Sequence, residues 1–220
     1  MKFGILKERK NPPDRRVVFS PNELTRLKQK YQNVSVKVER SDIRIFDDAQ
    51  YENLGIEVTD DISDCDILFG VKEVPIENLI PNKSYFFFSH TIKKQPYNRE
   101  LLQAILEKNI DLYDYETIVD SENRRLIGFG RYAGIVGAYN GIRAFGIKFE
   151  LFKLPKAETL SGKDALISHL KRLVLPPLKF VITGTGKVGN GAKEVLDAIK
   201  IKEVSPENYL TKNYAQPVYT

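Results

Sequence analysis

Residues 85–94 read Tyr85-Phe86-Phe87-Phe88-Ser89-His90-Thr91-Ile92-Lys93-Lys94. The four aromatic residues predict a short buried strand, because so brief and so apolar a run suits a sheet that is covered on both faces. The strand gives way to a polar group that holds His90, one of two histidines, and Lys93 three positions later. In open α/β sheets, ligands bind beyond the carboxyl ends of the strands. The stretch therefore predicts either a position for chemistry at a sheet edge or a solvated turn.

Strand and helix patterns alternate on both sides of this stretch. Strands are predicted at residues 2–7, 34–38, 66–71 and 110–113, and helices at residues 47–54 and 98–108. The alternation predicts an α/β fold with a mainly parallel sheet and helices on both faces, of the Rossmann or flavodoxin-like type.

Two helices carry local detail. Ser20-Pro21-Asn22-Glu23 predicts a helix start, in which Ser20 caps the helix and Glu23 returns the bond of a capping box. The helix at 98–108 is expected to turn four apolar residues inward: Leu101, Leu102, Ile105 and Leu106.

Residues 129–149 predict a long helix that is rich in glycine and alanine. Each glycine costs a helix about 1 kcal/mol relative to alanine, so their number indicates close contact with another backbone. We interpret this helix as a packed interdomain helix, preceded by a candidate short strand at 125–128. Residues 150–177 are interpreted as a connector that includes His169, to which no role is assigned.

A glycine-rich loop follows a predicted buried strand at residues 178–183. It reads Gly184-Thr185-Gly186-Lys187-Val188-Gly189 and opens a helix, which is the G-x-G-x-x-G arrangement of dinucleotide-binding domains. The helix N-terminus offers free N–H groups and a positive dipole to phosphates. Glu203, on a predicted second strand, is either the acceptor for the ribose hydroxyls of NAD or a surface residue. The neighbouring Lys202 leaves NADP open as well.

Composition narrows the classes of function. The 220 residues are 42% hydrophobic and 29% charged, as in an ordinary globular protein, and no apolar run is long enough to cross a bilayer. The net charge of +5 is spread along the chain, which disfavours a nucleic-acid partner and suits small anionic substrates. The single cysteine, Cys65, excludes an internal disulfide and a cysteine-based zinc site, and no metal site is assigned. We expect a cytoplasmic location without membrane attachment.

These features divide the chain into a substrate-side domain at residues 1–130, an interdomain helix and connector at 131–177, and the start of a Rossmann domain at 178–220. The last part holds one βαβ unit of a domain that normally has several strands. The sequence is therefore expected to be a piece of a longer enzyme and inactive alone.

Seven segments stand out when they are taken in order. They are Lys7-Glu8-Arg9-Lys10, Arg16-Val17-Val18-Phe19-Ser20-Pro21, Gly70-Val71-Lys72-Glu73-Val74-Pro75, Phe87-Phe88-Ser89-His90-Thr91-Ile92-Lys93, Tyr113-Asp114-Tyr115-Glu116, Gly128-Phe129-Gly130-Arg131-Tyr132-Ala133-Gly134 and Gly184-Thr185-Gly186. Together they resemble the alanine dehydrogenase/saccharopine dehydrogenase superfamily. The likeness is greatest to lysine-forming saccharopine dehydrogenases and the lysine–ketoglutarate reductase domain, and it covers nearly all of the chain, with 150–177 poorly matched.

The resemblance implies an NAD- or NADP-dependent reaction that interconverts saccharopine with lysine and 2-oxoglutarate. It implies acid–base roles for Lys72 and His90 in a cleft between domains, and a carboxylate-binding role for Arg16, to which we add Lys93. Of Arg124 and Arg125, the second aligns better with a substrate-side arginine.

The chemistry agrees with these roles, since histidine titrates near neutrality, burial can bring lysine there, and arginine binds carboxylates bidentately. An alanine dehydrogenase-like enzyme is the nearest alternative, although alanine gives Lys93 no obvious task. A non-catalytic ligand-binding module or partner subunit is another. The oligomeric state is left open.

Overall fold

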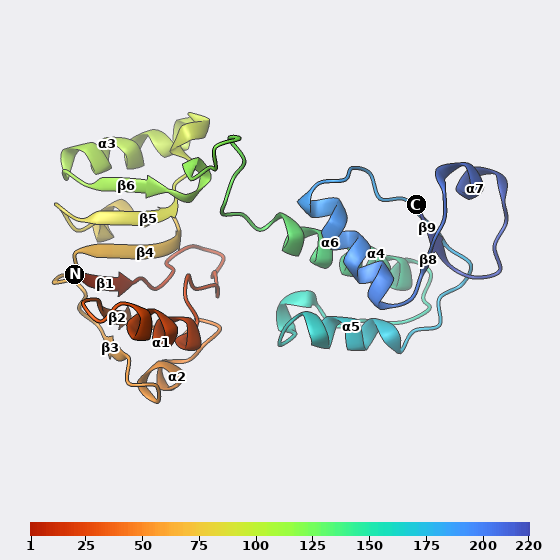
Figure 1. The fold of residues 1–220 in the computed structure, drawn as a ribbon, viewed down its shortest axis with the longest axis horizontal. Coiled ribbons are helices and arrows are strands. Elements are labelled where there is room, and N and C mark those ends of the chain that lie inside the picture. Colours follow the sequence, from red (N-terminus) through yellow and green to blue (C-terminus); the bar gives the residue numbers. More distant parts are fainter. The chain divides into compact units, whose positions relative to one another are not determined.

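The structure is a computed structural model that describes residues 1–220. The chain forms two compact units, Met1–Gly128 and Phe129–Thr220 (Figure 1). No helix has both the length and the apolar character that a membrane span requires. The division into residues 1–130, 131–177 and 178–220 stays a prediction.

The first unit is built on six strands in the order β3-β2-β1-β4-β5-β6, all paired in parallel. Its strands are β1 (Lys2–Ile5), β2 (Ser35–Glu39), β3 (Glu57–Thr59), β4 (Ile67–Lys72), β5 (Ser84–Phe88) and β6 (Asp111–Asp114). Its helices are α1 (Pro21–Lys30), α2 (Asp48–Glu52) and α3 (Arg99–Glu107), with 3-10 turns η1 (Ile76–Asn78), η2 (Thr91–Lys93), η3 (Pro96–Asn98) and η4 (Tyr115–Thr117). The predicted α/β fold with a parallel sheet is confirmed.

Strand β5 is covered on both faces. Tyr85 and Phe87 are fully buried in a cluster that includes residues of α3. Phe86 points to the other face, because side chains alternate along a strand, and its ring stacks on that of Phe69 with 4.9 Å between centroids. Phe69 packs against the cluster that contains Leu24 of α1. Helices therefore cover the sheet on both sides, and the aromatic run lies between them.

The predicted start of helix α1 is confirmed. Ser20 Oγ accepts the Glu23 backbone N–H, and Glu23 Oε2 accepts the Ser20 N–H at 2.8 Å. Both bonds of the capping box are therefore present.

The prediction for α3 is wrong at two positions. Leu101 and Ile105 are buried as expected, but Leu102 is 42% and Leu106 is 72% exposed, while Ala104 is buried. Each helical residue turns about 100°, so a stripe at i, i+3 and i+4 faces the sheet and its neighbours turn away. The apolar residues of α3 therefore extend beyond the face of the helix that is buried.

The short strand predicted at residues 125–128 is also wrong. Arg125 makes one isolated antiparallel bridge with Val119, and no ladder follows. Two further backbone bonds flank this bridge, from the Asp120 N–H to the Arg124 carbonyl and from the Leu126 N–H to the Ile118 carbonyl, each at 3.0 Å.

The second unit has three strands in the order β7-β9-β8, in which β9 pairs in parallel with both neighbours. Its helices are α4 (Gly130–Lys148), α5 (Lys163–Lys171), α6 (Lys187–Ala198) and α7 (Pro206–Thr211), with the 3-10 turn η5 (Ala157–Thr159). Its strands are β7 (Lys179–Phe180), β8 (Lys202–Glu203) and β9 (Val218–Tyr219). In the usual Rossmann order the second strand lies beside the first; here β9 lies between β7 and β8.

Glycines bring α4 and α6 together. A Cβ added at Gly134 would overlap the carbonyl oxygen of Val188, and one at Gly191 would overlap that of Arg131. The predicted helix and its close backbone contact are thereby confirmed. By contrast, a Cβ added at Gly137 or Gly141 would have no neighbouring atom within 4 Å.

The strand predicted at residues 178–183 is shorter and less buried than expected. Its ladder covers Lys179–Phe180, and Val181 is 56% exposed. β7 lies at an edge of the sheet, which leaves one of its sides unpaired. Its backbone bonds to the β9 segment nevertheless run from Leu178 to Ile182.

Candidate functional site

Four neighbouring strands of the first unit deliver polar side chains to one sheet edge. Glu8 follows β1, Lys72 ends β4, His90 follows β5 and Glu116 follows β6. Since β1, β4, β5 and β6 are adjacent and parallel, their carboxyl ends meet at the same edge.

His90 has an unusual backbone conformation, with φ of 57° in the left-handed region that few non-glycine residues adopt. Bonds from Asp114 fix the backbone next to His90 and the loop that carries its partner Glu116. Ser89 is fully buried and donates its backbone N–H to Asp114 Oδ2 at 3.2 Å, with a second bond from its hydroxyl. Asp114 Oδ1 also accepts the Glu116 N–H at 2.8 Å. Asp114 thus ties the loop after β5 to the loop after β6.

Glu116 is the centre of a charged cluster. Its Oε2 lies 2.9 Å from His90 Nδ1, and its Oε1 lies 3.3 Å from Lys93 Nζ. Arg125 donates to Oε1 as well, and its Nε bonds the Glu116 carbonyl at 3.3 Å. Burial opposes the charged form, but the bonds from His90, Arg125 and Lys93 outweigh it and lower the pKa of Glu116 to about 2. The group is therefore a buried carboxylate among three basic side chains.

This contact also orients the histidine. When Nδ1–H donates to the carboxylate, Nε2 carries the lone pair and can accept a proton. Lys93 Nζ lies 3.1 Å from the same Nδ1. Three residues predicted for the site, His90, Lys93 and Arg125, are thus joined through one that was not predicted.

Lys72 lies beside a group of carboxyl side chains. Its backbone N–H donates to Glu8 Oε2 at 3.0 Å, and the next residue, Glu73, pairs with Lys10 at 2.8 Å. The pKa of Glu73 is raised by burial and lowered by Lys10 and by the charge of His90, and the lowering prevails. Glu73 is therefore within electrostatic reach of His90.

Arg16 lies in the loop after β1 and pairs with Asp14, with 2.9 Å from Nε to Oδ1. This bond, together with the charges of Arg16 and Lys72, lowers the pKa of Asp14 against the opposing effect of burial. Arg16 and Lys72 are thus within electrostatic reach of one carboxylate, and both belong to the first unit.

The glycine loop of the second unit has the shape its spacing predicts. Gly184 has φ of 92°, and a Cβ at Gly189 would overlap the Gly184 carbonyl oxygen. Gly186 caps α6 and has no atom within 4 Å of a Cβ position. Asn190 Nδ2 donates to the Thr185 carbonyl at 3.0 Å and fixes the turn. The loop leaves an open approach to the N-terminus of α6, where Lys187 and Val188 begin the helix.

Glu203 is placed differently from the expectation for a ribose acceptor. It ends β8, which β9 separates from β7 and the glycine loop. Its carboxylate pairs with Lys193, whose bond lowers the pKa of Glu203. Its role toward a cofactor stays a prediction.

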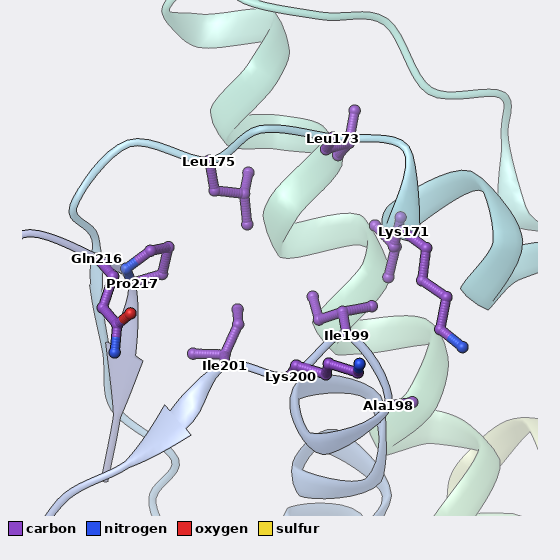
Figure 2. A pocket seen from close by; sticks show the side chains of 10 residues that line it. Lys171, Leu173, Leu175, Ala198, Ile199, Lys200, Ile201, Gln216 and Pro217 are labelled. Atoms are coloured by element: carbon purple, nitrogen blue, oxygen red, sulfur yellow. The ribbon is translucent and has the colours of Figure 1, made fainter.

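A cavity of ≈480 Å³ lies elsewhere in the second unit (Figure 2). Leu175 and Ile201 point toward one another across it, and Lys171 and Lys200 are at its rim. Its residues precede β8 and β9, so it opens at the edge of the small sheet opposite the glycine loop. It contains none of the predicted site residues.

Sequence reasoning missed Glu8, Asp114 and Glu116. Each is an acidic residue at or just after the end of a strand, and a search for acids at predicted strand ends would have found them. The bond from Ser89 to Asp114 spans 25 residues of the chain and that from Lys72 to Glu8 spans 64, distances that no local pattern reveals.

A model of the alanine dehydrogenase/PNT N-terminal domain matches residues 4–136. The chain belongs to this family. The resemblance drawn from the motifs is thereby confirmed at the level of the family.

Relatives extend the match over most of the chain. It is 34% identical over 225 residues to an alpha-aminoadipic semialdehyde synthase of Arabidopsis thaliana, covering 92% of this chain and 21% of the relative. It is 25% identical over 214 residues to the lysine-forming, NAD(+) saccharopine dehydrogenase of Yarrowia lipolytica, covering 90% and 58%. The chain thus spans a fifth to somewhat over half of these relatives. The matches support an amino-acid oxidoreductase family.

Solved structures share the fold. An L-alanine dehydrogenase matches with a TM-score of 0.65 at 19% identity, over 100% of this chain and 61% of that one. A transhydrogenase from Sinorhizobium meliloti matches with a TM-score of 0.63 at 16% identity, over 95% and 60%.

Proposed function

We propose that this chain carries the substrate-side site of an NAD- or NADP-dependent oxidoreductase that interconverts saccharopine with lysine and 2-oxoglutarate. The observation that carries the proposal is the cluster at one sheet edge, where His90 bonds Glu116 beside Lys93 and Arg125. The names of the Arabidopsis and Yarrowia relatives support the choice of reaction.

Joining an amine to a ketone requires protons to be delivered and removed as water leaves. In the proposal Lys72 and His90 share this work, since both stand at the ends of adjacent strands. His90 accepts or returns a proton at Nε2, while Glu116 holds its Nδ1. The carboxylate keeps the ring oriented without taking part in the proton transfer.

The substrates carry several carboxylates, and the proposal assigns them to the cations at the edge. Arg16, Lys93 and Arg125 are each partly or largely exposed there. Each already pairs with a protein carboxylate, Asp14 or Glu116. Substrate carboxylates would therefore join these pairs, and the acids would limit the repulsion among the cations.

The glycine loop from Gly184 to Gly189 is the proposed cofactor site. The open space at Gly186 and the N–H groups at the start of α6 suit a pyrophosphate. A bound nicotinamide dinucleotide would supply or accept the hydride. In this proposal residues 1–130 form the substrate side, 131–177 the interdomain helix and connector, and 178–220 the first part of the nucleotide domain.

The test is initial-rate oxidation or reduction of NAD(P)(H) by the full-length protein with three substrate sets. The proposal expects turnover with lysine plus 2-oxoglutarate, or with saccharopine in reverse. Turnover with alanine or pyruvate alone would replace the saccharopine reaction by an alanine dehydrogenase-like one. Cofactor binding without turnover on any set would favour a non-catalytic module.

A further inference from the structure

Strand β4 has an extra residue between Phe69 and Lys72. Phe69 pairs with Phe86, but Lys72 pairs with Phe88, so three steps along β4 match two along β5. Such a bulge changes the direction in which the following side chain points, and bulges are common beside active sites. The direction of Lys72 is therefore set by how the bulge is held.

Glu8 holds it. Oε1 of Glu8 accepts the Val71 N–H at 2.7 Å, and Oε2 accepts the Lys72 N–H at 3.0 Å. The ladder between β1 and β4 ends at Phe69, paired with Ile5, so no strand residue of β1 stands opposite these two amides. One carboxylate replaces the missing ladder bonds, and it is buried from competing water.

The placement of a carboxylate here is costly. Burial raises the pKa of Glu8, and Asp14 raises it further, although the two backbone bonds and the charge of Arg16 lower it. The phenol of Tyr115 also lies within electrostatic reach of Glu8. Four further charged residues line a small cavity with Glu8: Lys7, Arg9, Lys72 and Glu73. An apolar side chain would fill the space at lower cost but would leave two amides without a partner. The carboxylate of Glu8 therefore serves to hold the β4 backbone in position.

Glu8 has no room to touch a substrate on this side. The cavity that it lines with Gly70, Lys72 and Glu73 has a volume of ≈10 Å³, enough for about one water molecule. The shortest route from Glu8 to the proposed chemistry is therefore through the backbone of Val71 and Lys72, beside the weaker effect of its charge on Arg16.

We infer that Glu8 is a positioning residue for Lys72, an inference that rests on the proposed acid–base role of Lys72. In Glu8→Gln the amide oxygen can accept one N–H, while the new NH2 group opposes the other. The bulge then loses one of its two bonds and Lys72 shifts.

The first test is steady-state kinetics of Glu8→Gln in the full-length protein with lysine and 2-oxoglutarate. A small displacement of a reacting group can cost up to about 100-fold, so kcat should fall about 10–100-fold. KM should stay within about threefold, because the substrate cations are unchanged. The matched control is Asp66→Asn, which makes the same carboxylate-to-amide change between the same two strands at the opposite edge, where the side chain accepts only the Lys2 N–H and the amide oxygen can keep that bond. Equal losses in both variants would overturn the inference.

The second test is a double-mutant cycle with Lys72→Met. If Glu8 acts through Lys72, adding Glu8→Gln to Lys72→Met should reduce kcat by less than about twofold more. If the fold-losses in kcat of the two single variants multiply in the double variant, the positioning role is overturned. Full activity of Lys72→Met alone would instead contradict the proposed function, so the two failures are distinguishable.

A readout independent of activity is amide hydrogen exchange of the segment 70–74. It should be faster in Glu8→Gln and unchanged in Asp66→Asn; equal exchange in wild type and Glu8→Gln would overturn the inference. If Glu8→Gln does not fold, Glu8→Asp replaces it, since it keeps the charge but shortens the reach. Wild-type kcat in Glu8→Asp would show that charge, not the two-point bond, is what matters.

Discussion

Nδ1 of His90 lies 2.9 Å from Oε2 of Glu116, a buried carboxylate on the neighbouring loop. The contact joins a histidine that was predicted to be a site residue to an acid that had been assigned no role. Because Lys93 and Arg125 bond the same carboxylate, the charge of Glu116 keeps three basic groups together at the sheet edge.

Glu116→Gln should weaken the first unit at neutral pH by about 1–3 kcal/mol, since it removes the partner of three cations. The pKa of Glu116 is lowered from its ordinary 4.5 to about 2, so its carboxylate stabilises the fold above 4.5. That stabilisation is lost as the pH falls from 4.5 toward 2. Thermal unfolding across this window should therefore show a difference from wild type that shrinks with acid.

The control for Glu116 is Glu122→Gln, a carboxylate in a largely exposed pair with Arg124. It should change the unfolding temperature little at any pH. A Glu116→Gln difference that stays constant down to pH 2 would contradict the account of the cluster.

Two glycines of the nucleotide loop should separate binding from folding. Gly186→Ala places its methyl in open space, so the unfolding temperature should hold while NAD(P)H affinity falls by about tenfold or more. Gly189→Ala meets the Gly184 carbonyl and should lower the unfolding temperature. Fluorescence titration and calorimetry measure the two effects. Unchanged affinity in Gly186→Ala would remove the loop from cofactor binding.

A second glycine pair tests the contact of α4 with α6. Gly134→Ala forces a methyl against the Val188 carbonyl and should destabilise the second unit by about 1–3 kcal/mol. Gly137→Ala, on the same helix, enters open space and should stabilise it by up to about 1 kcal/mol. Denaturant unfolding distinguishes them, and equal effects of either sign would be inconsistent with the packing described.

The sequence predicted what depends on neighbours in the chain. The Ser20 capping box is local, and so is the turn at Gly184, where the spacing of glycines dictates the backbone. The aromatic strand was predictable too, because only a strand covered on both faces accommodates four such residues.

What escaped prediction depends on partners that are distant in the chain. The predicted burial of Leu102 and Leu106 is wrong, because tertiary contacts decide which face of α3 packs against the sheet. Glu116 meets His90 across 26 residues, and Glu8 meets Val71 across 63. The position of β9 between β7 and β8 follows from pairing that no local pattern encodes.

The central claim is that Lys72 and His90 perform the acid–base chemistry of an NAD(P)-linked reaction of lysine with 2-oxoglutarate. The direct measurement is kcat of the full-length protein and of Lys72→Met and His90→Gln at saturating substrates. The account predicts turnover in the wild type and a loss of about 10²–10⁴-fold in each variant, with NAD(P)H affinity unchanged. Wild-type kcat in both variants would contradict it.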